Sequence, residues 1–234
     1  MKIFLTGDTH IPIDIGKISY GVWPQSKDLT REDLLIVLGD FGLIWDNDPS
    51  EEEKYWAEVL SSKPYTILFL DGNHENHWRL SLLPRVNLFG SEVGKVSDNI
   101  FHLRRGEVYT IAGKKFFVFG GALSIDKHTR KQGISWWKEE IGSHAEMDRG
   151  LDNLCKHEFK VDYILSHTLP QEIADKYLSC IGRSRFSEEK DPTELYLSHI
   201  CSLTKFDKLY SGHWHDSWND GKHFTLYEEI LRLL

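Results

Sequence analysis

The sequence has few cysteines, no long apolar run and no excess of positive charge, and each shortage argues against a class of protein. Its three cysteines among 234 residues are far apart, so we expect neither a disulfide framework nor a cysteine-based zinc site. No apolar run approaches the roughly 20 residues that span a bilayer, and the first run meets Gly7 and Asp8 too early for a signal peptide. The 28 basic against 36 acidic residues give a net charge of −8, which disfavours a nucleic-acid partner. We therefore expect a cytoplasmic protein with no membrane partner.

The chain consists of short apolar segments between helical patterns. Apolar runs typical of strands buried on both faces occur at Lys2–Thr6, Leu34–Leu38, Thr66–Leu70, Tyr163–Leu165 and Lys208–Tyr210. Further strands are expected at Ile100–Leu103, Glu107–Ile111, Lys115–Phe119 and His223–Tyr227, with a hairpin turn at Ala112-Gly113-Lys114. Helices are expected at Ser50–Ser61, Ala145–His157 and Thr193–Leu203. Since no linker, repeat or low-complexity tract interrupts the chain, the pattern predicts one layered α/β domain over residues 1–234.

Polar residues that suit a metal ion follow the five apolar runs. They are Asp8, His10, Asp40, Asn73, His74, His167, His213 and His215. In open α/β sheets the carboxyl ends of the strands form the ligand-binding edge, so we expect these side chains to lie together. Each has an ordinary explanation when taken alone, such as a turn, a core histidine or a helix cap, and it is the ordered set that indicates a metal site. Oxygen and imidazole donors without thiolates favour Mn, Fe, Zn or a similar divalent metal.

The same segments resemble, in order, the motif series of the calcineurin-like metallophosphoesterases. The matching motifs are Asp8-Thr9-His10, Gly39-Asp40, Gly72-Asn73-His74-Glu75, Ser166-His167 and Gly212-His213-Trp214-His215. The resemblance covers residues 7 to 215, nearly the whole chain. It implies a four-layer sandwich, in which two mixed β-sheets pack together with helices outside, and a two-metal site at one edge.

The resemblance also implies a role for each residue. One metal ion would be held by Asp8, His10, Asp40 and His215. The other would be held by Asp40, Asn73, His167 and His213, with Asp40 bridging the pair. Two divalent ions are implied, with Mn²⁺ favoured and Fe, Zn or Ni as alternatives. A water or hydroxide that bridges them would attack phosphorus, and His74 would protonate the leaving group or stabilise charge. Asp40 and His74 are thus the catalytic candidates.

The loop after Gly39-Asp40 departs from the family pattern. Many members have a second Asp three residues after the first, which orients the catalytic histidine, but here Leu43 stands at that position. The partner of His74 therefore stays open, and the candidates are Asp46, Asp71, Glu75 or a backbone carbonyl.

A further motif gives an indication of substrate class. Phe119-Gly120-Gly121, together with Gly-Asp-Phe and Gly-Asn-His-Glu, resembles the branch of the family that includes the RNA lariat debranching enzyme. That enzyme, however, has a Cys in place of the ligand at Asp8.

Basic residues gather in the segment that follows this motif. The loop Ser124–Gly133 is either a solvated surface or the mouth of the site, and its candidates for contact with a substrate phosphate are Lys127, His128 and Arg130. Trp136-Trp137 is expected to cover the core. A second basic pair, Arg183 and Arg185, is assigned to an irregular surface segment at Cys180–Asp191, and another such segment is expected at Ile11–Asp28.

The motifs predict a metal-dependent phosphatase or phosphodiesterase that acts on a small-molecule or nucleotide phosphate ester. They specify neither the natural ester nor the oligomeric state. The alternative is a nucleotide- or nucleic-acid-binding protein that keeps the dimetal fold with little turnover. A pure binder, however, has no need of a histidine acid at His74. A purely structural metal site is disfavoured because such sites are closed and rich in cysteine.

Overall fold

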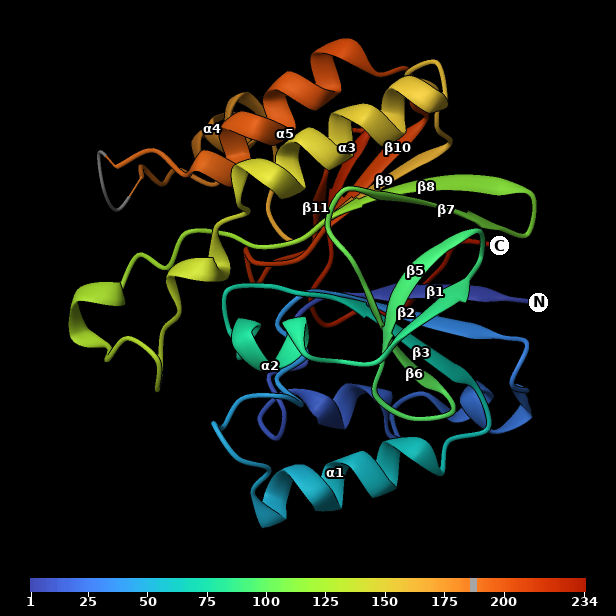
Figure 1. Cartoon of the computed structure of the whole chain (residues 1–234). Coiled ribbons are helices and arrows are strands. Elements are labelled where there is room, and N and C mark those ends of the chain that lie inside the picture. Colours follow the sequence, from blue (N-terminus) through green and yellow to red (C-terminus); the bar gives the residue numbers. More distant parts are fainter. Residues whose placement is uncertain (186–188) are drawn as a thin grey trace.

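Two mixed β-sheets lie face to face, with helices over both outer faces (Figure 1). This is seen in the computed structural model, which describes residues 1–185 and 189–234. The four-layer α/β sandwich expected from the sequence is confirmed.

The first sheet has the strand order β13-β1-β2-β3-β6-β5-β4. Its strands are β1 (Ile3–Thr6), β2 (Leu34–Leu38), β3 (Thr66–Leu70), β4 (Arg85–Leu88), β5 (Ser91–Lys95), β6 (Ile100–Leu103) and β13 (Leu231–Arg232). Strands β1, β2, β3 and β6 are parallel, and antiparallel strands flank them on both sides. The parallel strands β1 to β3 are buried along their whole length, as their continuous apolar sequences require.

The second sheet has the order β11-β12-β10-β9-β8-β7. Its strands are β7 (Glu107–Ile111), β8 (Lys114–Phe119), β9 (Tyr163–Ser166), β10 (Lys208–Ser211), β11 (Trp218–Asn219) and β12 (His223–Thr225). The expected hairpin joins β7 and β8, and Ala112 and Gly113 have φ of 49° and 77°. Positive φ at both central residues is the geometry that matches the twist of a two-residue hairpin.

The three helices expected from the sequence are present as α1 (Glu51–Ser61), α3 (His144–Lys156) and α5 (Pro192–Leu203), and α2 (His77–Ser81) and α4 (Gln171–Cys180) are additional. Ser50 and Asp191 cap the first turns of α1 and α5, and Ser143 forms a capping box with Glu146 at the start of α3. Helix α1 covers the first sheet, whereas α3, α4 and α5 cover the second (Figure 1). No helix among the described residues is long and apolar enough to cross a membrane.

Successive side chains of a strand point to opposite faces of its sheet, so the apolar side chains are divided among the layers. In β2, Leu34, Ile36 and Leu38 belong to the cluster between the two sheets. Leu35 and Val37 face the other way and pack in the cluster that contains residues of α1. A third cluster joins the outer face of the second sheet to α3, α4 and α5. The central cluster fixes the two sheets against each other, so loops from both sheets meet at one edge.

Several elements lie outside the sequence prediction. The β4–β5 hairpin was not expected, because its half-exposed strands lack a continuous apolar run. Helix α4 was not expected either, although Pro170 precedes apolar residues at helical spacing. The segment expected to be irregular at Ile11–Asp28 contains 3₁₀ turns at Ile15–Ile18 and Pro24–Asp28. Of the segment Cys180–Asp191, residues 186–188 lie outside the described part of the chain.

Gly120 directly follows β8, and its backbone approaches the end of β3 in the other sheet. A Cβ atom at this position would overlap the carbonyl oxygen of Asp71, the residue that follows β3. The next residue, Gly121, has φ of 84° and donates its backbone N–H to that same carbonyl at 2.8 Å. The glycine pair therefore lets the end of β8 run directly against the end of β3.

We expect Gly120→Ala to lower the free energy of unfolding by about 1–3 kcal/mol, because the added methyl group has no room beside the Asp71 backbone. The matched control is Gly16→Ala, since a Cβ at Gly16 meets no atom within 4 Å. Urea unfolding of the metal-free protein measures both. Equal midpoints for the two variants would contradict the close approach of β8 and β3.

Candidate metal centre and catalytic pocket

Strained backbone marks the loops at the carboxyl ends of the strands. Five of the metal-type residues have φ in the left-handed region that non-glycine residues rarely adopt: Asp8, His10, Asp40, His213 and His215, with values of 29°, 34°, 48°, 70° and 48°. Such strain costs of order 1–3 kcal/mol per residue and is found mainly at functional sites. Here it bends each loop so that its side chain turns toward the neighbouring loops.

The first group of donors consists of Asp8, His10, Asp40 and His215. Each offers one ligand atom, and these atoms all lie within 4.8 Å of one another. His10 places Nε2 3.2 Å from Asp40 Oδ2, while its Nδ1 lies 2.8 Å from Asp14 Oδ2. A carboxylate on the far nitrogen is the usual way in which a protein orients a ligating histidine.

A second group of donors adjoins the first. Asn73 Oδ1 lies 3.1 Å from both His167 Nε2 and His213 Nδ1, and His167 Nε2 lies 3.4 Å from Asp40 Oδ2. His167 Nδ1 lies 2.8 Å from the carbonyl oxygen of Leu38, which can only accept. When the ring is neutral, this contact holds its proton on Nδ1 and leaves the Nε2 lone pair for a ligand of the group. Asp40 is therefore common to both groups.

The residues present fit a pair of divalent ions. They offer carboxylate and amide oxygens and imidazole nitrogens, the donor set of Mn, Fe or Zn sites, and no thiolate. Asp8, Asp40 and His167 are at most 1% exposed, so their attraction for a cation would be little screened by bulk water. One ion could lie within each group, with Asp40 shared.

In the metal-free site, protonated histidines supply the positive charge that bound ions would supply. Burial raises the pKa of Asp8 to about 6. Burial also opposes ionisation of Asp40, yet His167 and His10 hold its pKa well below the usual value. Burial lowers the pKa of His10 and His167, but the neighbouring carboxylates outweigh it and raise the values to about 9 and about 10. Two protonated histidines thus neutralise the carboxylates of the metal-free protein.

His74 has an arginine rather than a carboxylate beside it. The guanidinium of Arg130 lies 3.1 Å from its Nδ1 and 3.2 Å from its Nε2, and the ring stacks on Trp45 at 5.7 Å between centroids. Its backbone N–H donates to Asp40 Oδ1 at 2.7 Å. Burial, helped by the positive charge of Arg130, outweighs the opposing effect of Asp40 and lowers the pKa of His74 to about 4. The structure therefore favours the neutral imidazole.

None of the three carboxylates considered as partners of His74 contacts it in the described part of the chain. Asp71 pairs with Arg105 and accepts from His102, behind the site. Glu75 accepts the backbone N–H groups of Phe41 and Gly72 at 2.6 Å each and so shapes the two loops. Leu43, where many relatives have the orienting Asp, is buried in the apolar cluster on the outer face of the first sheet.

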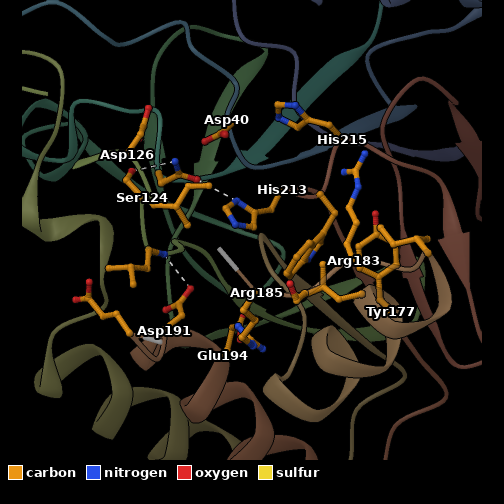
Figure 2. A pocket seen from close by; sticks show the side chains of 18 of the residues that line it. Asp40, Ser124, Asp126, Tyr177, Arg183, Arg185, Asp191, Glu194, His213 and His215 are labelled. Atoms are coloured by element: carbon orange, nitrogen blue, oxygen red, sulfur yellow. Dashed lines mark hydrogen bonds and ion pairs between the residues drawn. The ribbon is translucent and has the colours of Figure 1, made fainter. Parts of the chain in front are cut away.

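A cavity of about 790 Å³ opens from the donor groups toward α4 (Figure 2). Asp40 and His215 lie near the top of Figure 2, and Arg185, Asp191 and Glu194 lie below them. Leu123, Ile125, Leu178 and Ile181 give its wall an apolar part. The site is thus large enough for a phosphate ester with a sizeable organic group.

Of the three residues expected to meet substrate, the structure brings Arg130 alone to this cavity. Lys127 pairs instead with Glu189 at 2.6 Å, and His128 is exposed; neither lines the cavity. Trp137 is buried against Trp45 at 5.1 Å, in keeping with a core role.

Sequence reasoning missed three basic residues at the site. Lys17 donates to the carbonyl oxygens of Gly7 and Asp8 and so fixes the first loop. Arg183 and Arg185, assigned to a surface segment, line the cavity from the end of α4. No local signal in the sequence distinguishes the two arginines from solvated residues, because only the tertiary fold brings the end of α4 close to the metal loops.

The fold and the donor set are those of a metal-binding α/β sandwich. The chain matches the family model for calcineurin-like phosphoesterases over residues 1–217, and it belongs to this family. The family expected from the motifs is confirmed. Membership implies a dinuclear divalent metal site and, with the donor cluster, supports metal-dependent hydrolysis of phosphate esters. No curated protein matches the chain.

We expect metal binding to release protons, because a ligating imidazole must be neutral. The raised pKa values of about 9 for His10 and about 10 for His167 mean that both rings are protonated at pH 7 in the metal-free protein. Binding there should release close to two protons, and the apparent affinity should strengthen as the pH rises toward 9. Titration calorimetry in buffers of different ionisation enthalpy measures the release, and His10→Gln should release about one proton fewer. A binding heat that is the same in every buffer would contradict the protonated state.

Proposed function

We propose that the protein hydrolyses phosphate esters with two divalent metal ions bound side by side at the edge of the sandwich. The observation that carries this proposal is the position of the Asp40 carboxylate, which lies between two separate groups of donors. A shared carboxylate is what holds two ions about 3.5–4 Å apart in enzymes that displace a group at phosphorus. The family supports the same reaction class.

The proposed ligands follow the two groups. The first ion is assigned to Asp8, His10, Asp40 and His215, and the second to Asp40, Asn73, His167 and His213. Asn73 contributes a neutral amide oxygen, which limits the negative charge of the site and so leaves it able to accept a phosphate. We propose Mn²⁺ as the native ion, with Fe, Zn or Ni as alternatives.

The chain's own groups complete the proposed reaction. When bound, the ions would activate water as a nucleophile and stabilise charge on the phosphoryl oxygens. Arg130 offers a planar guanidinium that can donate two hydrogen bonds to a phosphoryl group. His74, held neutral beside Arg130, would donate a hydrogen bond to an oxygen on which charge develops rather than a full proton. This arrangement suits esters with good leaving groups, such as activated diesters.

The cavity supports a small-molecule or nucleotide ester as substrate. Its apolar wall and the half-buried side chain of Trp214 can cover an organic group beside the phosphate. Arg183 adds positive charge on the side of α4, where Arg185 is paired with Asp175 and Glu194. A nucleic acid stays disfavoured by the net charge of −8. The resemblance of Phe119-Gly120-Gly121 to the debranching-enzyme branch stays a prediction about substrate class.

Two further expectations belong to the same proposal. We place the protein in the cytoplasm, because its cysteines, Cys155, Cys180 and Cys201, are free thiols. We also treat residues 1–234 as one domain, since a single apolar cluster joins both sheets.

The direct test is hydrolysis by protein loaded with Mn²⁺. The substrates are p-nitrophenyl phosphate, its bis ester and a panel of nucleotides. The proposal expects turnover that EDTA abolishes and Mn²⁺ restores. Binding of nucleotides without turnover of any ester would favour the alternative, a binding protein that keeps the fold.

His74→Ala should keep both metal ions and lose about 10²–10³-fold in kcat, the usual effect of removing one donor to a developing oxyanion. Because His74 is held neutral, the loss should be similar for aryl esters with good and poor leaving groups. A loss that grows steeply as the leaving group worsens would instead identify His74 as a general acid.

Arg130→Met should lower kcat/KM by about ten- to a hundredfold, since hydrogen bonds to a charged group contribute about 1.5–3 kcal/mol each. The matched control is Lys131→Met, which removes an exposed positive charge from the next residue. If the two variants lose activity equally, the effect of Arg130 is one of general charge and not of contact with the phosphoryl group.

A further inference from the structure

The amide of Asn73 is held from behind by two side chains that do not touch the proposed ions. Asn73 Nδ2 donates to Ser124 Oγ at 3.1 Å, on the side away from His167 and His213. Ser124 Oγ in turn donates to Glu140 Oε2 at 2.6 Å, and the Ser124 backbone N–H donates to Glu140 Oε1 at 2.9 Å. Asn73, Ser124 and Glu140 are 5%, 2% and 0% exposed, so bulk water does not compete for these bonds.

The direction of this chain of hydrogen bonds determines which atom of Asn73 faces the metal site. As a carboxylate, Glu140 can only accept, and its 2.6 Å contact with Ser124 is in the range of charge-assisted O–H···O⁻ bonds. The single hydroxyl proton of Ser124 is therefore used toward Glu140, and its oxygen is left to accept. Because Ser124 Oγ accepts, the group of Asn73 that faces it must be the NH₂ group, which donates. The amide oxygen then faces His167 and His213.

The opposite amide orientation would defeat a metal site. It would present two N–H donors to the position of a cation and place the carbonyl oxygen against the lone pairs of Ser124. Asparagine is otherwise free to turn its amide by about 180° at little cost, because its terminal torsion is broad and roughly two-fold.

The second sheet provides the support for this chain. Ser124 follows the Gly120-Gly121 pair after β8, and Glu140 ends the 3₁₀ turn Lys138–Glu140. The Glu140 carbonyl oxygen accepts from Arg105 at 3.0 Å, and Arg105 also donates to Asp71 Oδ2 at 2.7 Å. Asp71 lies two residues before Asn73. Buried hydrogen bonds therefore hold the side chain of Asn73 through Ser124 and Glu140, and the backbone just before it through Asp71 and Arg105.

We propose that Ser124 and Glu140 are positioning residues that fix the Asn73 amide with its oxygen toward the second metal ion. The inference rests on the proposed two-metal function, and it assigns a role to residues that lie 51 and 67 positions from Asn73 in the sequence.

The test measures binding of Mn²⁺ by titration calorimetry and by the EPR signal of the bound ions. The protein should bind two ions, seen as a spin-coupled pair. In Ser124→Ala and in Glu140→Gln the second ion should bind about 10–100-fold more weakly, the usual cost of losing a residue that orients a ligand. The first ion should keep its affinity and give the signal of an isolated Mn²⁺. Excess Mn²⁺ should restore the coupled signal.

Glu140→Gln makes the test specific, because it keeps the shape of the side chain and reverses one hydrogen bond. The Gln amide donates to Ser124 Oγ, which frees the hydroxyl proton for Asn73 and favours the wrong amide orientation. Ser26→Ala is the control for Ser124→Ala, since Ser26 is a buried serine whose hydroxyl donates to the Trp23 carbonyl, far from the site in the sequence and the fold. It should bind both ions normally. If Ser124→Ala does not fold, Glu140→Gln tests the proposal by itself.

Wild-type affinity for the second ion in Glu140→Gln would overturn the proposal and leave the proposed function intact. Equal weakening of both ions would also overturn it, because it would show a general loss of structure. If the unaltered protein binds fewer than two ions, the proposed function itself fails.

Discussion

The Asp40 carboxylate is the group on which the rest of the site depends. It is buried at the end of β2 and faces His10 on one side, His167 on the other and the backbone N–H of His74 in front. A buried carboxylate is costly unless positive charge or hydrogen bonds surround it. In the metal-free protein the two histidines supply that charge by holding protons. Cations at the same place would release those protons and take over their electrostatic role, so we expect metal binding and protonation to compete here.

The sandwich supplies Asp40 with neighbours from both sheets. The first sheet contributes the loops after β1, β2 and β3, and the second contributes the loops after β9 and β10. The central apolar cluster that joins the sheets therefore also sets the distance between the two donor groups. The segment after β8 adds Ser124 behind Asn73 and Arg130 in front of His74. The orientation of the site residues therefore depends on the contacts that hold the two sheets together.

Much of this arrangement could be predicted from the sequence. Strands such as Leu34–Leu38 and Thr66–Leu70 were expected with their observed bounds, because parallel strands buried on both faces leave a continuous apolar signature. The metal-type residues could be proposed from the sequence because each lies in a loop that directly follows such a strand. The partner of His74 could not be found in this way. Arg130 lies 56 residues from His74 and reaches it only through the tertiary fold, and no rule of spacing relates the two. The arginines after α4 were missed for a similar reason, since they meet the site across the cavity, whereas α4 itself was missed although its helical spacing is present in the sequence.

The most direct measurement of the central claim is the anomalous diffraction of crystals grown with Mn²⁺. The account predicts two anomalous peaks about 3.5–4 Å apart, with the Asp40 carboxylate between them. One peak should lie among Asp8, His10 and His215, and the other among Asn73, His167 and His213. A single peak, or a pair of peaks that does not share Asp40, would contradict the account.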